Sequence, residues 1–416
     1  MTLLAKLVAL LSLVLALAAE PLAQTPAIKT GIETLREQNF DILQGKHVGL
    51  ITNPSGVDAS LRSTIDILFK AQGVKLVALF GPEHGVRGNI PAGGWVESSR
   101  DSATGLPVFS LYGRTKKPTS EMLKGVDVLV YDIQDVGCRS YTFVATLGLA
   151  MEAAAEHHIP FVVLDRPNPL GGERIEGNIV EEGFKSFVSP YPIPYIYGLT
   201  CGELAKMLNG EGMLANRVAC DLTVVPMQGW KRSMTFEQTG LPWVPTSPHI
   251  PFASSPLYYA STGIMGELGI FSVGVGYTLP FHLFGAEWID PDRLCARLTA
   301  MRIPGVLFRP IAYTPMYGTL TGKQVGGVQL YIIEPSAANL MSLQFLMMQA
   351  HYELYPSKNP LLMADSTRRA MFDKVLGTNA IRLRFEKRLS YDDIKSYLQK
   401  DVEGFRRLSK QYMLYE

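Results

Sequence analysis

The sequence predicts an α/β protein whose N-terminal part is built on a parallel sheet with helices on both faces. Short, unbroken runs of Val, Leu and Ile recur there, as in HVGLIT and KLVALF. Stretches with helical periodicity separate these runs, as expected of βαβ units. The runs are apolar throughout rather than alternating, which is typical of strands that are covered on both faces of a parallel sheet.

The expected elements of this part follow in chain order. Strands are expected at 47–52, 75–80, 126–133, 160–165 and 222–227. Helices are expected at 63–72, 141–158 and 201–208. The first of these helices ends at Gly73, and the third begins with the capping-box-like sequence TCGE. The segment SPYPIPYIYGLT is rich in proline and cannot form a regular central strand.

The pattern changes in the C-terminal half. From 229 to 291 proline, glycine and aromatic residues are dense and helical periodicity is weak, which predicts long ordered loops. The tail combines an expected strand with two expected helices, at 327–333, 337–352 and 391–410. We place the domain boundary near 214–221. This gives an N-terminal domain of residues 28–216 and a C-terminal domain of residues 217–416.

The first residues have the pattern of a secretory signal peptide. Lys6 precedes an apolar run from Leu7 to Leu17, and small residues follow at Ala18 and Ala19. We therefore expect a signal peptide at 1–19 and a periplasmic or extracellular protein. The run is short for a membrane span, so no stable membrane insertion is expected after cleavage, although an uncleaved anchor is an alternative.

Charge and cysteine content narrow the function classes. The 416 residues carry a formal net charge of +1 without a long basic run, which argues against nucleic-acid binding. The oligomeric state is left unassigned. The chain has 4 cysteines, at 138, 201, 220 and 295. They permit two disulfides in three pairings, or buried free thiols. None forms a CxxC pair, so no structural zinc site is expected.

Polar residues gather where the predicted parallel strands end. GPEHGVRG places Glu83, His84 and Arg87 after the second strand. The other strand ends carry Asn53 in ITNPSG, Asp132, Gln134, Asp135 and Arg139 in YDIQDVGCRSYTF, and Asp165 and Arg166 in LDRPNPLGG. The carboxyl ends of parallel strands lie at one edge of the sheet, where α/β proteins bind ligands. Carboxylates, a histidine, arginines and tyrosines in one cleft suit acid/base chemistry on a sugar.

Common cofactor motifs are missing from these loops. GPEHG is not HExxH, and neither GxGxxG, a P-loop nor GxSxG occurs there. We therefore predict no metal, nucleotide or organic cofactor. Structural alternatives stay open for the candidates. Glu83 could begin a helix, Asp132 and Asp135 could cap loops or pair with Arg139, and Asp165 with Arg166 could hold a turn.

Several long motifs, in order, resemble the NamZ-type exo-β-N-acetylmuramidase family over nearly the whole mature chain. They are GLITNPSGVD, ALFGPEHGVRG, YDIQDVGCRSYTF, LDRPNPLGG, GNIVEEGFKSFVSPYPIPYIYGLTCGELA, LPWVPTSPHIP and FDKVLGTNAIR. The resemblance implies a Rossmann-like parallel-sheet N-terminal domain, a smaller α+β C-terminal domain and a cleft between them. It also implies release of N-acetylmuramic acid from the non-reducing ends of peptidoglycan-derived saccharides.

The resemblance puts the catalytic glutamate on Glu83, which we expect to protonate the glycosidic oxygen. Asp132 or Asp135 would orient water, orient Glu83 or stabilise the oxocarbenium-like state. The expected substrate-binding residues are Asn53, His84, Arg87, Gln134, Arg139, Tyr141, Asp165, Arg166 and Glu267. No nucleophile is assigned, so retention and inversion both stay open.

The sequence departs from the family pattern at SVGVGYTLPFH, where many family members have a sequence like SEGRGTTRPFE. A glutamate and two arginines become Val273, Val275 and Leu279. An arginine there would pair with the lactyl carboxylate of muramic acid, so a different amino sugar or glycan is an alternative substrate. Glu267 in MGELG either supplies a carboxylate or makes a structural hydrogen bond. A non-catalytic sugar-binding protein and a hydrolase with Cys138 as nucleophile are further alternatives.

Overall fold

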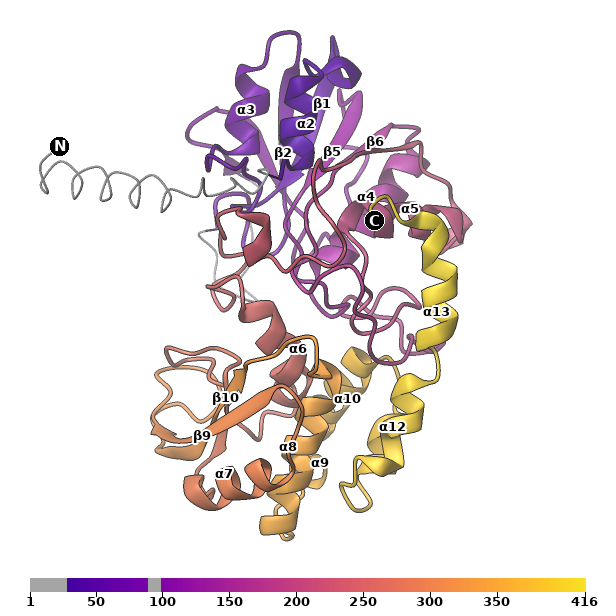
Figure 1. Cartoon of the computed structure of the whole chain (residues 1–416). Coiled ribbons are helices and arrows are strands. Elements are labelled where there is room, and N and C mark those ends of the chain that lie inside the picture. The colour runs from indigo at the N-terminus through magenta and orange to yellow at the C-terminus, as the bar shows by residue number, and fades with distance from the viewer. Residues whose placement is uncertain (1–27, 89–98) are drawn as a thin grey trace, which may run out of the picture.

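The computed structural model describes residues 28–88 and 99–416. The predicted signal peptide, 1–19, lies outside the described residues. Two lobes are visible, with the N-terminal sheet in one and a smaller sheet in the other (Figure 1). No helix in the described ranges has both the length and the apolar character needed to cross a bilayer.

The N-terminal lobe is organised by a sheet of 7 strands in the order β3-β4-β2-β1-β5-β6-β7. The strands are β1 (His47–Thr52), β2 (Lys75–Gly81), β3 (Ser99–Arg100), β4 (Pro107–Ser110), β5 (Val128–Asp132), β6 (Phe161–Leu164) and β7 (Leu222–Val225). All neighbours pair in parallel except β3 and β4. The predicted parallel α/β sheet is therefore confirmed.

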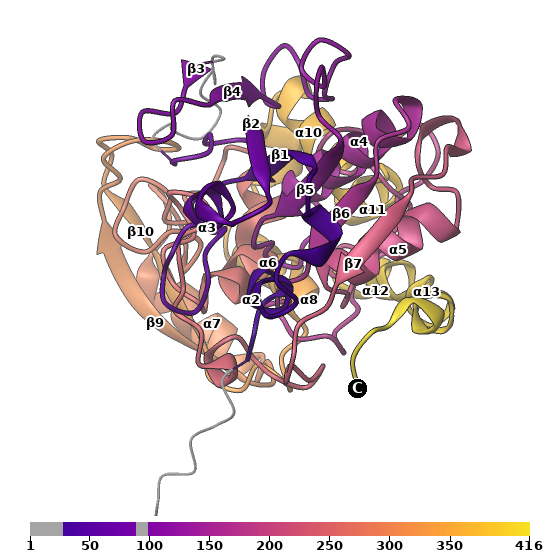
Figure 2. The same ribbon diagram turned by 90° about the horizontal axis from the view of Figure 1, so that it is seen from above.

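Helices cover both faces of this sheet, with α2 and α3 on one side and α4 and α5 on the other (Figure 2). Their bounds are α2 (Gly31–Glu37), α3 (Thr64–Lys70), α4 (Phe143–Glu156) and α5 (Cys201–Gly210). Side chains of β5 alternate between two apolar clusters. Val128 and Val130 pack with α2 and α3, whereas Leu129 and Tyr131 pack with α4 and α5. This two-sided burial explains why the strands are apolar without alternation.

The C-terminal lobe contains a sheet of 3 antiparallel strands in the order β8-β10-β9. The strands are β8 (Leu283–Ala286), β9 (Val306–Tyr313) and β10 (Val325–Ile332). The helices are α6 (Ser255–Gly266), α7 (Pro291–Ala300), α8 (Leu340–Leu354), α9 (Pro360–Met363), α10 (Ser366–Leu376), α11 (Ala380–Phe385), α12 (Asp392–Gln399) and α13 (Val402–Ser409). Short 3-10 helices lie at Asp41–Leu43, Ala215–Arg217, Glu237–Thr239 and Lys410–Tyr412.

Three features differ from the sequence-based expectations. The segment 229–291, expected to be loops, contains α6 and β8. The helix expected at 391–410 is broken near 400–401 into α12 and α13. β7 lies beyond residue 216, where we ended the N-terminal domain, yet it pairs with β6 in the large sheet. The sheet therefore extends past that position.

The chain end returns to the N-terminal lobe through α12 and α13 (Figure 1). The Tyr415 hydroxyl donates a hydrogen bond to Asp165 Oδ2 over 2.5 Å, and the Leu414 N–H donates to Glu203 Oε1 over 2.8 Å. Glu203 also forms a buried ion pair with Arg232. The C-terminal tail thus fastens the two lobes together beside β6.

Candidate active site

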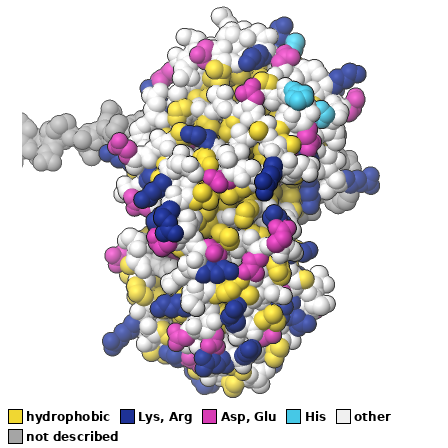
Figure 3. Space-filling model, turned by 90° about the vertical axis from the view of Figure 1, so that its right-hand side faces the viewer, with side chains coloured by type: hydrophobic (Ala, Val, Ile, Leu, Met, Phe, Trp, Pro, Cys, Tyr) yellow, Lys and Arg dark blue, Asp and Glu magenta, His cyan; other side chains and the backbone are white. Residues whose placement is uncertain are grey.

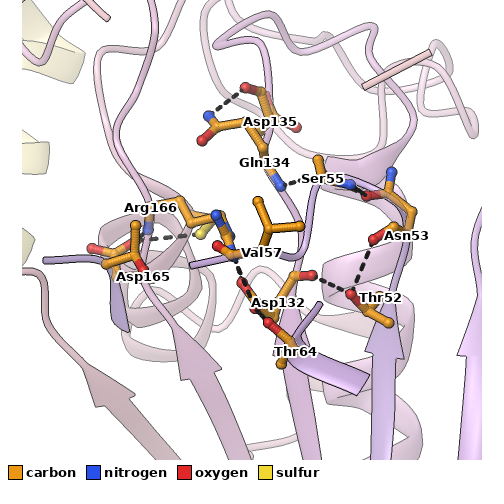
Figure 4. A network of polar contacts seen from close by, with 12 residues as sticks. Thr52, Asn53, Ser55, Val57, Thr64, Asp132, Gln134, Asp135, Asp165 and Arg166 are labelled. Atoms are coloured by element: carbon orange, nitrogen blue, oxygen red, sulfur yellow. Dashed lines mark hydrogen bonds and ion pairs between the residues drawn. The ribbon is translucent and has the colours of Figure 1, made fainter. Parts of the chain in front are cut away.

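The predicted polar loops follow four neighbouring strands, β2, β1, β5 and β6, at the same edge of the sheet. The chain runs from β1 to β2 on one side and later returns to β5 on the other side of β1. Such a reversal of strand order opens a crevice at the carboxyl ends of the strands. The predicted loops therefore lie at one edge of the sheet, and Figure 4 shows labelled residues of the loops after β1, β5 and β6 facing one another.

Glu83 is half-buried in the loop after β2, and its carboxylate is held from two sides. Thr142, the residue before α4, donates its hydroxyl to Glu83 Oε2 over 2.9 Å. Tyr112, which follows β4, also hydrogen-bonds Glu83. Burial, with the charge of Glu83 and this hydrogen bond, raises the pKa of Tyr112 to about 12. Tyr112 therefore stays a hydrogen-bond donor at neutral pH.

The next residue, His84, is buried and has a φ of 74°. Few residues other than glycine adopt this left-handed conformation, and strained backbone of this kind gathers at functional sites. Arg87, further along the loop, forms two hydrogen bonds with Asp101, of 2.9 and 3.0 Å. These contacts with Arg87 lower the pKa of Asp101 to about 2 despite partial burial. The geometry favours Arg87 as a brace of the loop.

Asp132 and Arg166 form a buried ion pair (Figure 4). Arg166 donates from Nε to Asp132 Oδ1 and from Nη2 to Oδ2, the latter over 2.9 Å. Thr64 donates its hydroxyl to the same Oδ2, and Arg166 also donates to the Val57 carbonyl over 2.8 Å. Both carboxylate oxygens are thus engaged within the protein. Asp132 therefore pairs with Arg166 rather than with Arg139, and both side chains have structural roles rather than sugar contacts.

Asp165 is also fully buried within the protein. Its Oδ1 accepts a hydrogen bond from the Gly202 N–H over 2.8 Å, and its Oδ2 accepts from Thr200 over 2.7 Å and from Tyr415. Burial raises the pKa of Asp165, although these donors oppose the shift. Asp165 therefore joins β6, the start of α5 and the C-terminal tail, which is a structural role.

Arg139 is fully buried and donates only within the protein. Its Nη1 donates to the carbonyls of Asn178 and Ile193 over 2.8 and 2.6 Å. Its Nη2 donates to the carbonyls of Val375 and Leu376, at the end of α10, over 3.0 and 2.9 Å. The guanidinium therefore clamps the N-terminal lobe to the C-terminal lobe. The structure does not bring it together with Glu83 as a sugar-binding group.

Of the three buried aspartates predicted for the site, Asp135 is the one that the structure favours for a catalytic role. Its Oδ1 accepts hydrogen bonds from the Tyr197 hydroxyl over 2.8 Å and from the Gly137 N–H over 2.7 Å. Burial raises the pKa of Asp135 to about 6, although these two donors oppose the shift. A carboxyl group that titrates near neutral pH in a cleft is a functional candidate.

Asn53 follows β1 and Gln134 follows the neighbouring strand β5 (Figure 4). Ser55 links them, because its N–H donates to Asn53 Oδ1 over 2.9 Å and its hydroxyl accepts from the Gln134 N–H over 3.0 Å. Gln134 Nε2 donates to the Pro167 carbonyl over 2.7 Å. Asn53 Nδ2 is buried and finds no hydrogen-bond partner in the structure as described.

Tyr141 lies where the two lobes meet. Its hydroxyl is 2.7 Å from the Thr246 hydroxyl, and its ring packs edge-on against Tyr259 of α6, with centroids 5.7 Å apart. Burial raises the pKa of the Tyr141 hydroxyl, and the negative charges of Asp135 and Glu83 add to this shift. Both carboxyl groups therefore lie near enough to Tyr141 to affect its hydroxyl.

Glu267 and the altered segment belong to the C-terminal lobe. Glu267 follows α6, and burial raises its pKa while Arg368 opposes the shift. Val273 is 7% exposed within the apolar core, and Val275 and Leu279 pack against apolar clusters. The apolar residues at these positions therefore pack into the C-terminal lobe.

Several contacting residues were not identified from the sequence. They are Tyr112, Thr142, Thr246, His249 and Tyr259. Thr142 lies inside the quoted motif YDIQDVGCRSYTF, and Thr246 and His249 lie inside LPWVPTSPHIP. The motifs therefore marked the segments that contain these residues. Secondary-structure periodicity gave no reason to choose individual residues within those segments.

Cysteine and metal chemistry gain no support at this site. The cysteines are all free, and burial raises the pKa of the Cys138 thiol well above its usual value. A buried thiol with a raised pKa is a poor nucleophile, which argues against the Cys138 alternative. Within residues 28–88 and 99–416, no three His, Cys, Asp or Glu side chains cluster as metal ligands would.

Comparisons with known proteins agree with this architecture. The models "Exo-beta-N-acetylmuramidase NamZ, N-terminal" and "Exo-beta-N-acetylmuramidase NamZ, C-terminal" match residues 48–254 and 257–415. The peptidoglycan β-N-acetylmuramidase NamZ of Bacillus subtilis (strain 168) is 45% identical over 393 residues, covering 94% of this chain and 92% of that protein.

Two crystal structures of DUF1343 family proteins from Bacteroides fragilis NCTC 9343 are also similar. The first has a TM-score of 0.90 and 56% identity, and the second has a TM-score of 0.75 and 30% identity. Each comparison covers 94% of this chain and 99% of the other. The likeness therefore extends over both lobes.

Proposed function

The chain belongs to the exo-β-N-acetylmuramidase NamZ family, and from that premise we propose that it releases N-acetylmuramic acid from the non-reducing ends of peptidoglycan fragments with Glu83 as its general acid. It is a glycosidase of the β-N-acetylmuramidase class. The observation that carries the role of Glu83 is its setting. The carboxyl group is half-buried, held by Thr142 and Tyr112, and shares the cleft with Tyr141.

This setting suits proton donation to a glycosidic oxygen. Hydrogen bonds from Thr142 and Tyr112 fix the orientation of the Glu83 carboxyl group, so that a bound sugar meets it in a defined geometry. Cleavage then builds positive charge on the muramic acid ring, while the sugar beyond the scissile bond leaves. Asp135, in the same cleft, is ionised above about pH 6 and supplies a negative charge that stabilises this state.

Product analysis tests the exo mode of action. A peptide-free glycan oligosaccharide with N-acetylmuramic acid at its non-reducing end is incubated with the enzyme, and the products are separated over time. We expect free N-acetylmuramic acid as the first released product, together with a chain that is one sugar shorter. A ladder of internal fragments at early times would show endo cleavage and refute the proposal.

The buried charge of Asp135 gives a prediction about stability. The pKa of Asp135 is about 6 in the folded protein against 3.8 for the ordinary group. The contribution of Asp135 to stability is therefore complete below the lower of these two pKa values. It is lost as pH rises through about 6. Asp135→Asn keeps an acceptor for Tyr197 and Gly137 and removes the charge. We expect the free energy of unfolding near neutral pH to rise by roughly 2 kcal/mol.

Urea unfolding at about pH 8 and about pH 4 checks this prediction. The gain in the free energy of unfolding of Asp135→Asn should disappear at the lower pH. The same variant should lose about 10²-fold in kcat/KM if the negative charge of Asp135 stabilises the transition state. Asp221→Asn, at an exposed position, is the control and should change neither quantity. A variant that is less stable near neutral pH and fully active would contradict both parts.

We propose further that the protein is exported, as its expected substrate lies outside the cytoplasm. Support comes from the order of Lys6, the apolar run and the small residues at Ala18 and Ala19. Mass spectrometry of the protein from fractionated cells should find a mature chain that begins near residue 20 outside the cytoplasm. A full-length chain confined to the cytoplasm would exclude export.

Surface charge is consistent with a small saccharide as partner. On the face drawn in Figure 3, basic and acidic side chains are mixed over both lobes rather than gathered by sign. This agrees with the formal net charge of +1. Such a face lacks the basic stripe that nucleic-acid binding requires.

A further inference from the structure

We propose that Tyr317 is an aromatic platform on which the leaving sugar, the ring beyond the scissile bond, stacks. The proposal rests on the function proposed above and names a further binding residue of the same site. It places an amino-sugar pyranose ring against the Tyr317 side chain, at the rim of the cleft that contains Glu83.

Tyr317 combines exposure with a fixed position. The residue lies in the loop between β9 and β10 and is 53% exposed, and its neighbour Met316 is 81% exposed. The Tyr317 ring nevertheless stacks on His249, with centroids 5.8 Å apart and an angle of 27° between the rings. The Tyr317 hydroxyl lies 3.1 Å from His249 Nε2. An exposed ring held in this way binds a ligand at a low cost in conformational entropy.

The backbone beneath Tyr317 is anchored to the segment that departs from the family pattern. The Met316 N–H donates to the Gly276 carbonyl over 2.7 Å. Gly276 has a φ of 90°, and a Cβ there would lie only 1.8 Å from the Tyr317 carbonyl oxygen. Only glycine fits such a contact. The glycine-rich stretch around Val275 therefore seats the Tyr317 loop.

His249 connects the platform to the catalytic loop. Thr246, three residues before His249, hydrogen-bonds the Tyr141 hydroxyl over 2.7 Å, and Thr142, the next residue after Tyr141, donates to Glu83 over 2.9 Å. Burial lowers the pKa of His249, and the charge of His84 adds to this shift. His84 directly follows Glu83. Phe281, from the same altered segment, packs edge-on against Tyr259, which in turn contacts Tyr141. Aromatic contacts thus connect the altered segment to Tyr141, the neighbour of Thr142.

The position of Tyr317 identifies the sugar that it would contact. In an exo-acting site the chain end enters deepest, so the ring nearest the surface belongs to the leaving part of the substrate. Pyranose rings present apolar C–H faces, and rigid aromatic side chains line sites that bind such faces. The half-buried Glu83 lies deeper than the exposed Tyr317, which assigns Tyr317 to the leaving ring rather than to muramic acid.

Calorimetric binding to two proteins tests this assignment. Glu83→Gln and the double variant Glu83→Gln/Tyr317→Ala are titrated with a MurNAc-GlcNAc disaccharide and with free N-acetylmuramic acid. We expect loss of the Tyr317 ring to raise the Kd of the disaccharide about 10-fold and to leave the Kd of the monosaccharide within about 2-fold. Tyr317→Phe keeps the ring and should stay within about 3-fold of the parent protein.

Kinetic measurements on proteins that keep Glu83 show whether Tyr317 binds the leaving sugar by stacking or positions the substrate for catalysis. Tyr317→Ala should raise KM for the disaccharide about 10-fold with kcat nearly unchanged. Tyr331→Ala, a 38% exposed tyrosine near the other end of the β9–β10 hairpin, is the matched control and should leave KM unchanged. The proposal is overturned if both sugars weaken equally, if neither weakens, or if kcat falls with KM unchanged.

The outcome also distinguishes this proposal from the proposed function. A wild type that releases no N-acetylmuramic acid but binds the disaccharide refutes the function, and the Kd comparison then still decides the role of Tyr317. A disaccharide that binds to neither protein refutes the platform, and release by the wild type would leave the proposed function standing.

Discussion

Replacing Glu83 with glutamine is expected to lower kcat for a MurNAc-GlcNAc disaccharide by at least about 10³-fold, with the substrate still bound. Glutamine has the shape of glutamate and can still accept hydrogen bonds from Thr142 and Tyr112, which hold the carboxyl group in the wild type. It cannot donate an acidic proton to the leaving oxygen. Steady-state kinetics and calorimetric binding on the same preparations measure the two quantities.

The leaving group separates a general acid from other essential roles. An aryl glycoside of N-acetylmuramic acid with a nitrophenyl group leaves without a proton, so the loss for Glu83→Gln on this substrate should shrink to about 10-fold or less. Glu121→Gln, at an exposed position, is the control. Equal losses on both substrates would contradict proton donation. A wild type that binds sugar without turnover would instead identify a sugar-binding protein.

Replacing Arg139 with methionine is expected to lower the free energy of unfolding by roughly 3–5 kcal/mol. The guanidinium is fully buried and donates to four backbone carbonyls, two in each lobe. Methionine fills part of the volume but removes these four hydrogen bonds, although Ser189 and Asn178 still donate to the Val375 and Leu376 carbonyls. Chemical unfolding followed by tryptophan fluorescence measures the change.

Two further variants make this prediction specific. Arg139→Lys keeps the charge but lacks the fork that reaches both lobes, so it should recover only part of the lost stability. Arg309→Ala removes an arginine whose side chain donates hydrogen bonds to Gln329, and it should change stability by less than about 1 kcal/mol. Unchanged stability with a raised KM for Arg139→Met would instead make Arg139 a sugar-binding residue.

The fold of the N-terminal lobe was readable because its strands are buried on both faces. Runs such as FVVL, which became β6, are apolar without interruption, and few other structures produce that pattern. The C-terminal lobe was harder to read. α6 contains Ser, Thr, Ala and Gly and is buried on most sides, so it shows no alternation of polar and apolar faces. Its helical character depends on tertiary packing, which local sequence does not reveal.

The loops of the candidate site lie at one edge of the sheet, as the sequence predicted, but the roles of their polar residues were not separable by sequence. Asp132 and Arg166 are 34 residues apart in the chain yet form one buried ion pair. Arg139 reaches carbonyls more than 230 residues away. Pairings at such separations depend on the folded structure. Glu83 differs because the glycine-flanked loop GPEHG marks it locally, whatever its partners.

The most direct test of the account is the release of free sugar by the wild type from two disaccharides, MurNAc-GlcNAc and GlcNAc-GlcNAc. Family membership and the setting of Glu83 predict release of N-acetylmuramic acid from the first and no N-acetylglucosamine from the second. The apolar residues at Val273 and Val275 would then alter packing in the C-terminal lobe without changing the sugar that is recognised. A folded protein that releases nothing from MurNAc-GlcNAc, or that prefers GlcNAc-GlcNAc, would contradict the account.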